Sequence, residues 1–463
     1  MTQLPDMTAA QLLAGYRSKD ISPVQVVDAI FERIDKWDEQ LNALYRANRE
    51  GSRAAAAASE ERWRRGEPAG LLDGVPVTVK ENIATKGCPV PLGSASSDQA
   101  PSGVDSPTAA RLREAHAVVI GKTTMPDFGM AASGVSSLHG VTRNPWNLNM
   151  NPGGSSSGAG AAAAAGYGPL HVGTDIAGSV RLPANWCGVV GFKPSFGRIP
   201  VDPPYTGRTI GPLTRTVEDS ALLMAAIARP DYRDHTILPS VQVDWETAAA
   251  PLDLSGVRIG FMPTAGAGLP VEHDVADAVA QAVARLESHG AAVEIVKPIL
   301  TEEMLDGLTA FLRIRLWAQI QSIPSPRRER IHEFFLRWTD GADALTGPDV
   351  FAAQAQIDAI ASSAHRTSAE IDYLVSPVAP VAAFPAERMT PTNDTKSPFD
   401  NLTFTLPFNL SQQPAISINC GWTTAGTPIG LQIAGKRFDD IGVLRAAAAY
   451  ESFGQASRPW PVK

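Results

Sequence analysis

The sequence predicts an α/β fold in one large domain, and three observations support that prediction. Short apolar runs bounded by Gly or Pro alternate along the chain with longer segments of helical periodicity. Residues 257–262, 275–286 and 292–296 follow the order strand, helix, strand, which places both strands in one sheet. The 463 residues are 44% hydrophobic and 19% charged, a composition that allows a large core. Since no internal repeat or linker interrupts the chain, we expect a single domain over 1–463.

The N-terminal part predicts alternating helices and strands. Ser22 and Pro23 suit an N-cap and a first helical position, and apolar residues at helical spacing extend that helix to residue 35. Further helices are expected over 49–65 and 108–116, and strands over 77–79 and 117–120.

The C-terminal part predicts a helical insertion over 228–350. Residues 228–256 are polar and contain several Pro and Asp, so we expect a surface excursion there. The aromatic residues of 301–350 are expected to anchor helices in the core and, as a group, could cover a pocket. The remaining elements expected are a turn and a helix over 211–227, strands over 372–376, 419–421 and 428–434, and a closing helix over 441–453.

The composition disfavours several partners and compartments. The net charge of −8 and the absence of a basic run argue against a nucleic-acid partner. No run of about 18 strongly apolar residues predicts a membrane span, and residues 1–20 lack the pattern of a secretory signal. Cys88, Cys187 and Cys420 are too widely spaced for a metal or disulfide pattern, which fits a reducing compartment, the cytoplasm.

The stretch 151–198 is the most informative part of the sequence. Two turns rich in Gly and Ser, 153–158 and 173–179, are separated by an Ala-rich segment, 159–166, and an apolar run, 169–172. The Ala-rich segment predicts a buried helix and the apolar run a buried strand. The two turns could therefore meet in space. A flexible Gly/Ser linker would not continue into such segments.

A serine in these turns could act as a nucleophile if a base and oxyanion donors lay beside it. The Gly-rich turn 175–179 can supply backbone donors. One candidate base is a histidine acting on Ser156, in the G-x-S-x-G of α/β-hydrolases, but that motif needs a preceding strand and residues 147–152 are polar. The other is Lys80, which follows an apolar strand, where burial would lower its pKa. From spacing alone, a solvated surface lysine is the simpler interpretation of Lys80.

Two partial nucleotide-binding motifs fail in their context. Residues 121–124 lack the first Gly of a phosphate-binding loop, because His116 stands at its place. The G-x-G-x-x-A at 158–163 follows a turn instead of a strand. We therefore predict no cofactor and no metal.

Several long motifs occur in a fixed order along the chain. They are GGSSSG at 153–158, GTDIAGSVRLP at 173–183, CGVVGFKPSFGR at 187–198, GVPVTVKENI at 74–83, PAI at 414–416 and PIGLQ at 428–432. In these motifs the chain resembles the amidase signature family of serine hydrolases, from about residue 20 to about residue 450. The resemblance implies a large central mixed β-sheet covered by helices on both faces.

The resemblance also implies a Ser–cis-Ser–Lys triad. By motif position, Ser179 would be the nucleophile, Ser155 the bridging serine in a cis peptide, and Lys80 the general base. The backbone N–H groups of the oxyanion hole would be those of Ile176, Ala177, Gly178 and Ser179. The supporting residues would be Gly154, Ser156, Asp175 and Arg181, the last two as an ion pair. Ala177 replaces a Gly that is usual in the family, and its methyl group requires a negative φ.

These residues predict an amidase that hydrolyses the C–N bond of a small carboxamide, anilide or carbamate through an acyl-enzyme on Ser179. A second hypothesis is the glutaminase subunit of a tRNA-dependent amidotransferase, which needs a partner. Such subunits are expected to carry an Asp three residues before the Thr of a Thr-Leu-Pro segment. Here Leu402 precedes Thr405, which suggests a less charged substrate.

A third hypothesis is a catalytically idle binding or scaffold protein on the same fold. The intact Lys80, Ser155 and Ser179 argue against it. Dimers are common in the family, so the resemblance suggests a homodimer. The sequence itself does not specify the acyl group, the amine or the residues that line the pocket.

Overall fold

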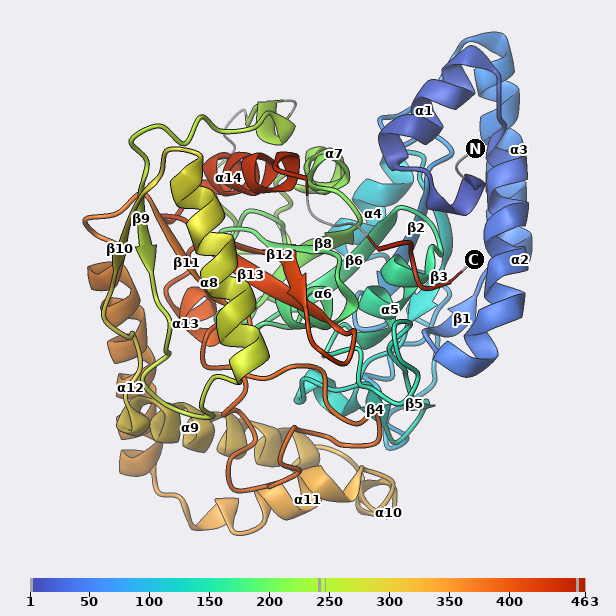
Figure 1. Cartoon of the computed structure of the whole chain (residues 1–463). Helices are drawn as coiled ribbons and strands as arrows, with labels where there is room; N and C mark the ends of the chain where they lie inside the picture. The colour runs from blue at the N-terminus through green and yellow to red at the C-terminus, as the bar shows by residue number, and fades with distance from the viewer. Residues whose placement is uncertain (1–2, 240–242, 246, 455–457, 463) are drawn as a thin grey trace.

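A single mixed sheet runs through the computed structural model, which describes residues 3–239, 243–245, 247–454 and 458–462 (Figure 1). In this part of the chain the sheet has eleven strands, in the order β1-β3-β2-β6-β8-β7-β12-β13-β11-β9-β10. The strands are β1 (Leu44–Ala47), β2 (Pro76–Lys80), β3 (Val118–Thr123), β6 (Leu170–Asp175), β7 (Val190–Lys193), β8 (Thr209–Thr214), β9 (Arg258–Phe261), β10 (Ala292–Ile295), β11 (Tyr373–Pro377), β12 (Ala415–Trp422) and β13 (Pro428–Ala434). A separate pair is formed by β4 (Val135–Ser136) and β5 (Gly140–Val141).

Parallel and antiparallel pairs alternate in blocks across this sheet. Strand β2 is parallel to both β3 and β6, and β9 is parallel to both β10 and β11. The pairs between these two blocks are antiparallel. The predicted mixed sheet is therefore confirmed, as is the placement of the 257–262 and 292–296 strands in it.

Helices cover both faces of the sheet. The longer ones are α1 (Ala9–Ser18), α2 (Pro23–Leu41), α3 (Arg49–Arg65), α4 (Pro107–Glu114), α5 (Ser157–Ala165), α6 (Arg181–Cys187), α7 (Val217–Ile227), α8 (His273–Ser288), α9 (Glu302–Gln321), α11 (Glu333–Thr339), α12 (Gly347–Thr367) and α14 (Asp440–Ser452), with short helices α10 (Ser325–Arg328) and α13 (Leu406–Leu410). Consecutive strand residues point to opposite faces. Accordingly, Ile416 packs with α7, α8 and α14, whereas its neighbour Ala415 packs in the cluster that contains α6.

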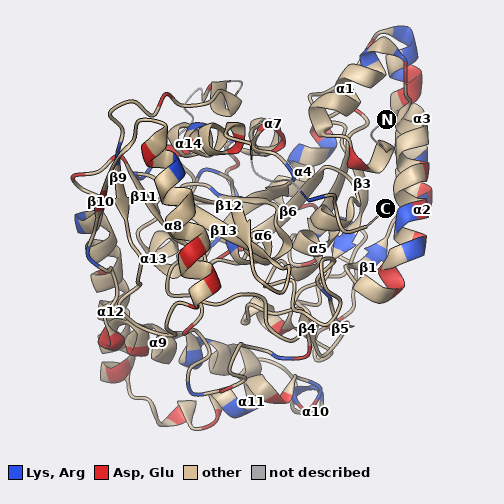
Figure 2. Cartoon of the chain, viewed as in Figure 1, with Lys and Arg blue, Asp and Glu red and all other residues tan. Residues whose placement is uncertain are grey.

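Local sequence signals place several helices correctly. The helix predicted from Ser22 and Pro23 is α2, and Ser22 forms a capping box with Gln25. It continues beyond residue 35 to Leu41, where Asn42 takes the left-handed conformation. The helix predicted over 49–65 is α3. In Figure 2, charged residues of both signs lie along α2 and α3 at one side of the molecule.

One predicted turn is wrong. The sequence predicts a turn at residue 211, followed by a helix. In the structure, Gly211 and Pro212 lie in the middle of strand β8, which is placed between β6 and β7 in the sheet. A side chain on Gly211 would collide with the carbonyl oxygen of Phe192, so the glycine permits a close approach of two strands and does not make a turn.

Residues 228–350 contribute both to the sheet and to a layer of helices beside it. Strands β9 and β10 extend the sheet at one edge, while α9 contacts α11 and α12 (Figure 1). The aromatic residues Phe334, Phe335 and Trp338 are buried in the core, as expected. Whether this region is an insertion stays a prediction. Within the described residues, no helix combines the length and apolarity needed to cross a membrane.

Helix α5, like its neighbour α6, is completely enclosed. All of its residues are buried, and it contacts β2, β3, β6 and β8. Its Ala and Gly side chains allow this close packing, as the sequence predicts.

We expect Ala163→Leu to lower the free energy of unfolding by about 1–3 kcal/mol, because Ala163 is fully buried and a larger side chain overpacks the helix interface. Chemical denaturation would measure the change. The matched control is Ala57→Leu on the exposed side of α3, which we expect to change stability by less than about 0.5 kcal/mol. Equal effects of the two substitutions would contradict the packing described for α5.

Candidate active site

The ends of two parallel strands bring the sequence-predicted residues together. Lys80 is the last residue of β2, and Thr174 lies at the end of β6, its parallel neighbour. Ser155 and Ser156 directly precede α5, and Ser179 lies in the turn between β6 and α6. The backbone N–H of Ser156 donates to the carbonyl oxygen of Ser179 at 3.2 Å, so the two predicted turns meet.

Lys80 is buried among three hydroxyl groups. Its Nζ lies 2.9 Å from Ser155 Oγ, 3.0 Å from Ser156 Oγ and 3.0 Å from Thr174 Oγ1. A charged ammonium would donate to all three, whereas a neutral amine has a lone pair that can accept a proton from one of them. Within the described residues, no carboxylate forms an ion pair with Lys80.

The surroundings of Lys80 favour its neutral form. Burial holds its pKa well below the usual 10.5, and the positive charge of Arg208 lowers the pKa further. The negative charges of Asp175 and Glu81 act in the opposite direction but do not outweigh the burial. The simpler interpretation from spacing, a solvated surface lysine, is wrong.

Ser179 is half-buried and faces a cavity. The cavity is also lined by Gly154, Ile176 and Ala177. The peptide bond between Gly154 and Ser155 is cis. In the described part of the chain, the Ser179 hydroxyl makes no hydrogen bond, so this structure does not join it directly to Ser155.

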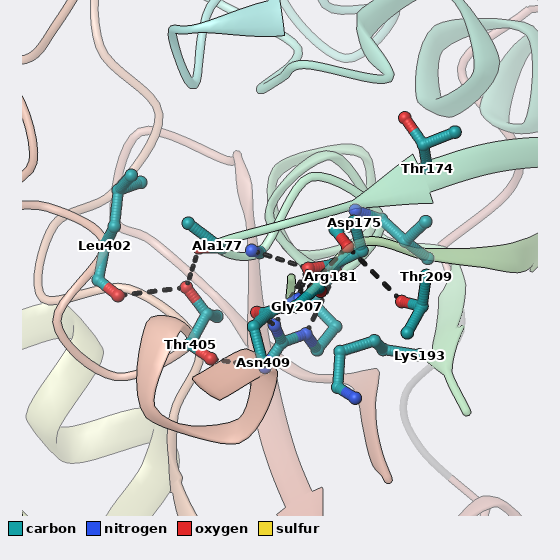
Figure 3. A network of polar contacts seen from close by, with 12 residues as sticks. Thr174, Asp175, Ala177, Arg181, Lys193, Gly207, Thr209, Leu402, Thr405 and Asn409 are labelled. Carbon is teal, nitrogen blue, oxygen red and sulfur yellow. Dashed lines mark hydrogen bonds and ion pairs between the residues drawn. The ribbon is translucent and has the colours of Figure 1, made fainter. Parts of the chain in front are cut away.

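A buried ion pair holds the turn that carries Ser179 (Figure 3). Asp175 and Arg181 are both fully buried, and Arg181 Nη2 lies 3.0 Å from Asp175 Oδ1. Burial acts to raise the pKa of Asp175, but the charge and hydrogen bonds of Arg181 hold it well below its usual range. The predicted pairing of these two residues is present.

The C-terminal half of the chain also contacts this turn. Thr405 Oγ1 donates to the carbonyl oxygen of Ala177 at 2.6 Å, and Asn409 Nδ2 donates to Asp175 Oδ1 at 2.9 Å (Figure 3). Gly178 has a φ of +122°, and a Cβ there would collide with Thr405 Oγ1. The turn therefore requires glycine at 178, while Ala177 is tolerated because its φ is negative.

The predicted set of oxyanion donors needs one correction. The backbone N–H of Gly178 donates to Asp175 Oδ1 at 2.7 Å, so it is not free to bind an oxyanion in this geometry. Within the described residues, the N–H groups of Ile176, Ala177 and Ser179 have no acceptor. These three remain candidate donors.

Ser156 is held in the structure in a way that does not suit a nucleophile. Its hydroxyl is buried, donates to the carbonyl oxygen of Thr174 at 3.2 Å and contacts Lys80. The residues before it form no strand. This arrangement does not match the α/β-hydrolase motif that the sequence left open.

Sequence reasoning missed Thr174 as a contact of Lys80. Asn82 Nδ2 also donates to Thr174 Oγ1, at 3.1 Å. Thr174 is part of the 173–183 motif and lies next to Asp175, so its position in that motif was the available signal. Among the described residues, no group of three or more His, Cys, Asp or Glu side chains could hold a metal ion.

Known proteins are similar to this chain over nearly its whole length. The model of the Amidase family matches residues 25–444. An acylamidase from Rhodococcus erythropolis is 33% identical over 99% of this chain and 96% of its own length. The A-type subunit of the glutamyl-tRNA(Gln) amidotransferase from Gloeobacter violaceus is 36% identical over 95% of each chain.

A solved structure of a bacterial aryl acylamidase of the amidase signature family superposes with a TM-score of 0.89, at 30% identity, over 96% of each chain. The two folds therefore match along nearly their whole length. The chain belongs to the amidase signature family, whose enzymes hydrolyse the C–N bonds of amides.

Proposed function

We propose that the chain is a self-sufficient amidase that cleaves a small carboxamide, anilide or carbamate through an acyl-enzyme on Ser179. The observation that carries this proposal is that Lys80 is buried, has a lowered pKa and contacts Ser155, whose neighbour Gly154 lines the same cavity as Ser179. Buried groups of shifted pKa in a cavity are typical of catalytic sites.

In the proposed mechanism, the proton of Ser179 passes to Ser155 as the proton of Ser155 passes to Lys80. Ser179 Oγ then bonds to the carbonyl carbon, and the oxyanion accepts hydrogen bonds from the N–H groups of Ile176, Ala177 and Ser179. The C–N bond breaks, and the relay returns the proton to the leaving amine. Water then adds to the acyl-enzyme through the same relay, releases the acid and regenerates Ser179.

The lining of the cavity supports a substrate with an apolar part. Met130, Leu182, Leu312, Phe399 and Leu402 all border the space beside Ser179. Apolar walls of this kind suit an aryl or alkyl group next to the amide.

A second candidate function is the glutaminase subunit of an amidotransferase. The similarity to the amidotransferase chain from Gloeobacter violaceus favours it. Against it, Leu402 stands where an Asp is expected in such subunits, and it borders the proposed substrate cavity. The scaffold hypothesis would require a site that no longer reacts.

The first prediction tests the nucleophile. A fluorophosphonate should label Ser179 in the isolated chain, as intact mass and peptide mapping would show, and labelling should be lost in Ser179→Ala and in Lys80→Met. Amide hydrolysis should fall by at least roughly 10⁴-fold in both variants.

Ser179→Ala removes no hydrogen bond of the described structure, so its free energy of unfolding should change by less than about 0.5 kcal/mol. Labelling of another serine would contradict the assignment. No labelling in a folded sample would favour the amidotransferase or scaffold hypotheses.

The second prediction concerns pH. Lys80 acts as a base only when neutral, so kcat/KM should rise with pH through the pKa of Lys80, with a midpoint well below 10.5 and full activity on the alkaline side. Rates of amide hydrolysis measured from about pH 5 to about pH 10 would show this limb. A rate that falls over that range as pH rises would contradict Lys80 as the base.

Two other buried lysines provide matched controls for the pH profile. Burial lowers the pKa of Lys122 and of Lys193 to about 7. Lys122→Met and Lys193→Met should keep the rising limb where the folded protein is recovered, because neither lysine contacts Ser155 or Ser179. If either variant lost the rising limb, that limb would report the titration of the replaced lysine, and its assignment to Lys80 would be wrong.

The third prediction concerns histidine. Replacing any single histidine should leave substantial amidase activity, because the proposed relay uses none. His171 is the stringent case, since it is buried on β6 and bonds Thr78. His171→Asn would be assayed after its unfolding temperature is measured. A folded histidine variant without activity would exclude the lysine mechanism.

A further inference from the structure

An uncompensated arginine borders the cavity beside Ser179. Arg315, on α9, is the one charged residue among the described residues that line this cavity. Its guanidinium forms no ion pair with any described carboxylate, and its Nη1 is buried without a hydrogen-bond partner. Buried polar groups in folded proteins are nearly always hydrogen-bonded, so an orphaned guanidinium nitrogen at a cavity calls for an acceptor from outside the chain.

A tyrosine beside Arg315 also has a polar group without a hydrogen-bond partner. The guanidinium of Arg315 stacks on the ring of Tyr205, 3.7 Å from its centre. The Tyr205 hydroxyl is also buried without a partner. Tyr205 lines a second space, which shares Ile176, Ala177 and Leu312 with the cavity beside Ser179. Two side chains with unpartnered buried donors are therefore stacked on each other, one at the cavity beside Ser179 and the other at the adjoining space.

A second arginine adds to the positive charge of this region. Arg208 is largely buried, and among the described residues its Nη1 donates only to the carbonyl oxygen of Pro203, at 3.4 Å. Burial lowers the pKa of Arg208 to about 10, and the nearby positive charge of Arg315 acts in the same direction, partly offset by Asp202. Like charges held together at partial burial oppose each other unless an anion lies between or beside them.

We propose that the substrate of this enzyme carries a carboxylate, which Arg315 and Tyr205 bind where the cavity beside Ser179 adjoins the space that Tyr205 lines. This inference rests on the proposed function, in which that cavity holds the substrate. A planar guanidinium binds a carboxylate through two parallel hydrogen bonds, and the tyrosine hydroxyl supplies a third donor. The substrate is therefore an amide of an acid or amine that bears a second, free carboxylate.

The charged residues at the cavity also indicate that the substrate carries no ammonium group. Leu402 stands where an Asp could pair with the ammonium of an amino acid, and no acidic residue is among the described residues that line the cavity. A zwitterion such as glutamine would leave its ammonium unpaired in an apolar space. The sequence suggests a less charged substrate from Leu402 alone. With Arg315 included, the structure favours an anion without an ammonium group.

The test compares anionic amides with neutral amides of the same shape. The monoanilide of succinic acid and the anilide of isocaproic acid place the difference on the acyl side. Para-acetamidobenzoate and para-isopropylacetanilide place it on the amine side. We expect kcat/KM to favour the anion in at least one pair. We expect Arg315→Gln to reduce that preference by roughly 10- to 100-fold, mainly through the KM of the anionic partner.

Matched variants separate binding from folding. Arg315→Lys should restore part of the preference, because the charge is kept while the bidentate geometry is lost. Tyr205→Phe should weaken it less than Arg315→Gln does. Arg313→Gln removes the same charge from the same helix, where the guanidinium donates to the carbonyl oxygen of Asp340, and should leave the preference unchanged. An equal effect of Arg313→Gln would overturn the proposal.

The outcomes distinguish this inference from the proposed function. Hydrolysis of neutral amides that depends on Ser179, with no preference for either anion, would overturn the carboxylate site and leave the amidase intact. A preference that survives Arg315→Gln and Tyr205→Phe in folded protein would overturn it as well. If neither anionic nor neutral amides are hydrolysed and Ser179 is not labelled, the proposed function itself fails.

Discussion

The geometry of the site depends on the buried carboxylate of Asp175. It accepts hydrogen bonds from the backbone N–H groups of Gly178 and Val180, at 2.7 and 3.1 Å, and is paired with Arg181. A fully buried charge is tolerated only when its partners replace water, and removing one partner typically costs about 3–5 kcal/mol. This carboxylate therefore fixes the turn between β6 and α6 as one unit, with Ser179 on its outer side.

The same network ties distant parts of the chain to that turn. Arg181 Nη1 also donates to the carbonyl oxygen of Thr405 and to Gln432, at 2.9 and 2.8 Å. These partners come from the start of α13 and from β13, more than two hundred residues further along the chain. Because Thr405 in turn binds the carbonyl oxygen of Ala177, the turn is held from both ends. The backbone donors beside Ser179 are thereby fixed before any substrate arrives, which is what an oxyanion hole requires.

Local sequence signals predict part of this arrangement and cannot predict the rest. Caps and periodicity place α2 and α3, and motif position brings Lys80, Ser155 and Ser179 to one site. The strand at Gly211 and Pro212 was missed, because its state depends on pairing with β6, which no local residue encodes. The N–H of Gly178 was assigned to the oxyanion hole, but its direction follows from a φ of +122° and from Asp175. Arg315 and Tyr205 belong to no motif, and only the tertiary fold brings them together.

The charges around Lys80 link its role as a base to the character of the cavity. The negative charge of Asp175 acts to raise the pKa of Lys80, but Arg181 pairs with that carboxylate. The positive charge of Arg208 also lowers the pKa of Lys80, in addition to burial. Arg208 and Arg315 also repel each other. Burial is the main cause of the lowered pKa of Lys80, and the positive charge of Arg208, which adds to it, lies near Arg315, the residue proposed to bind a carboxylate.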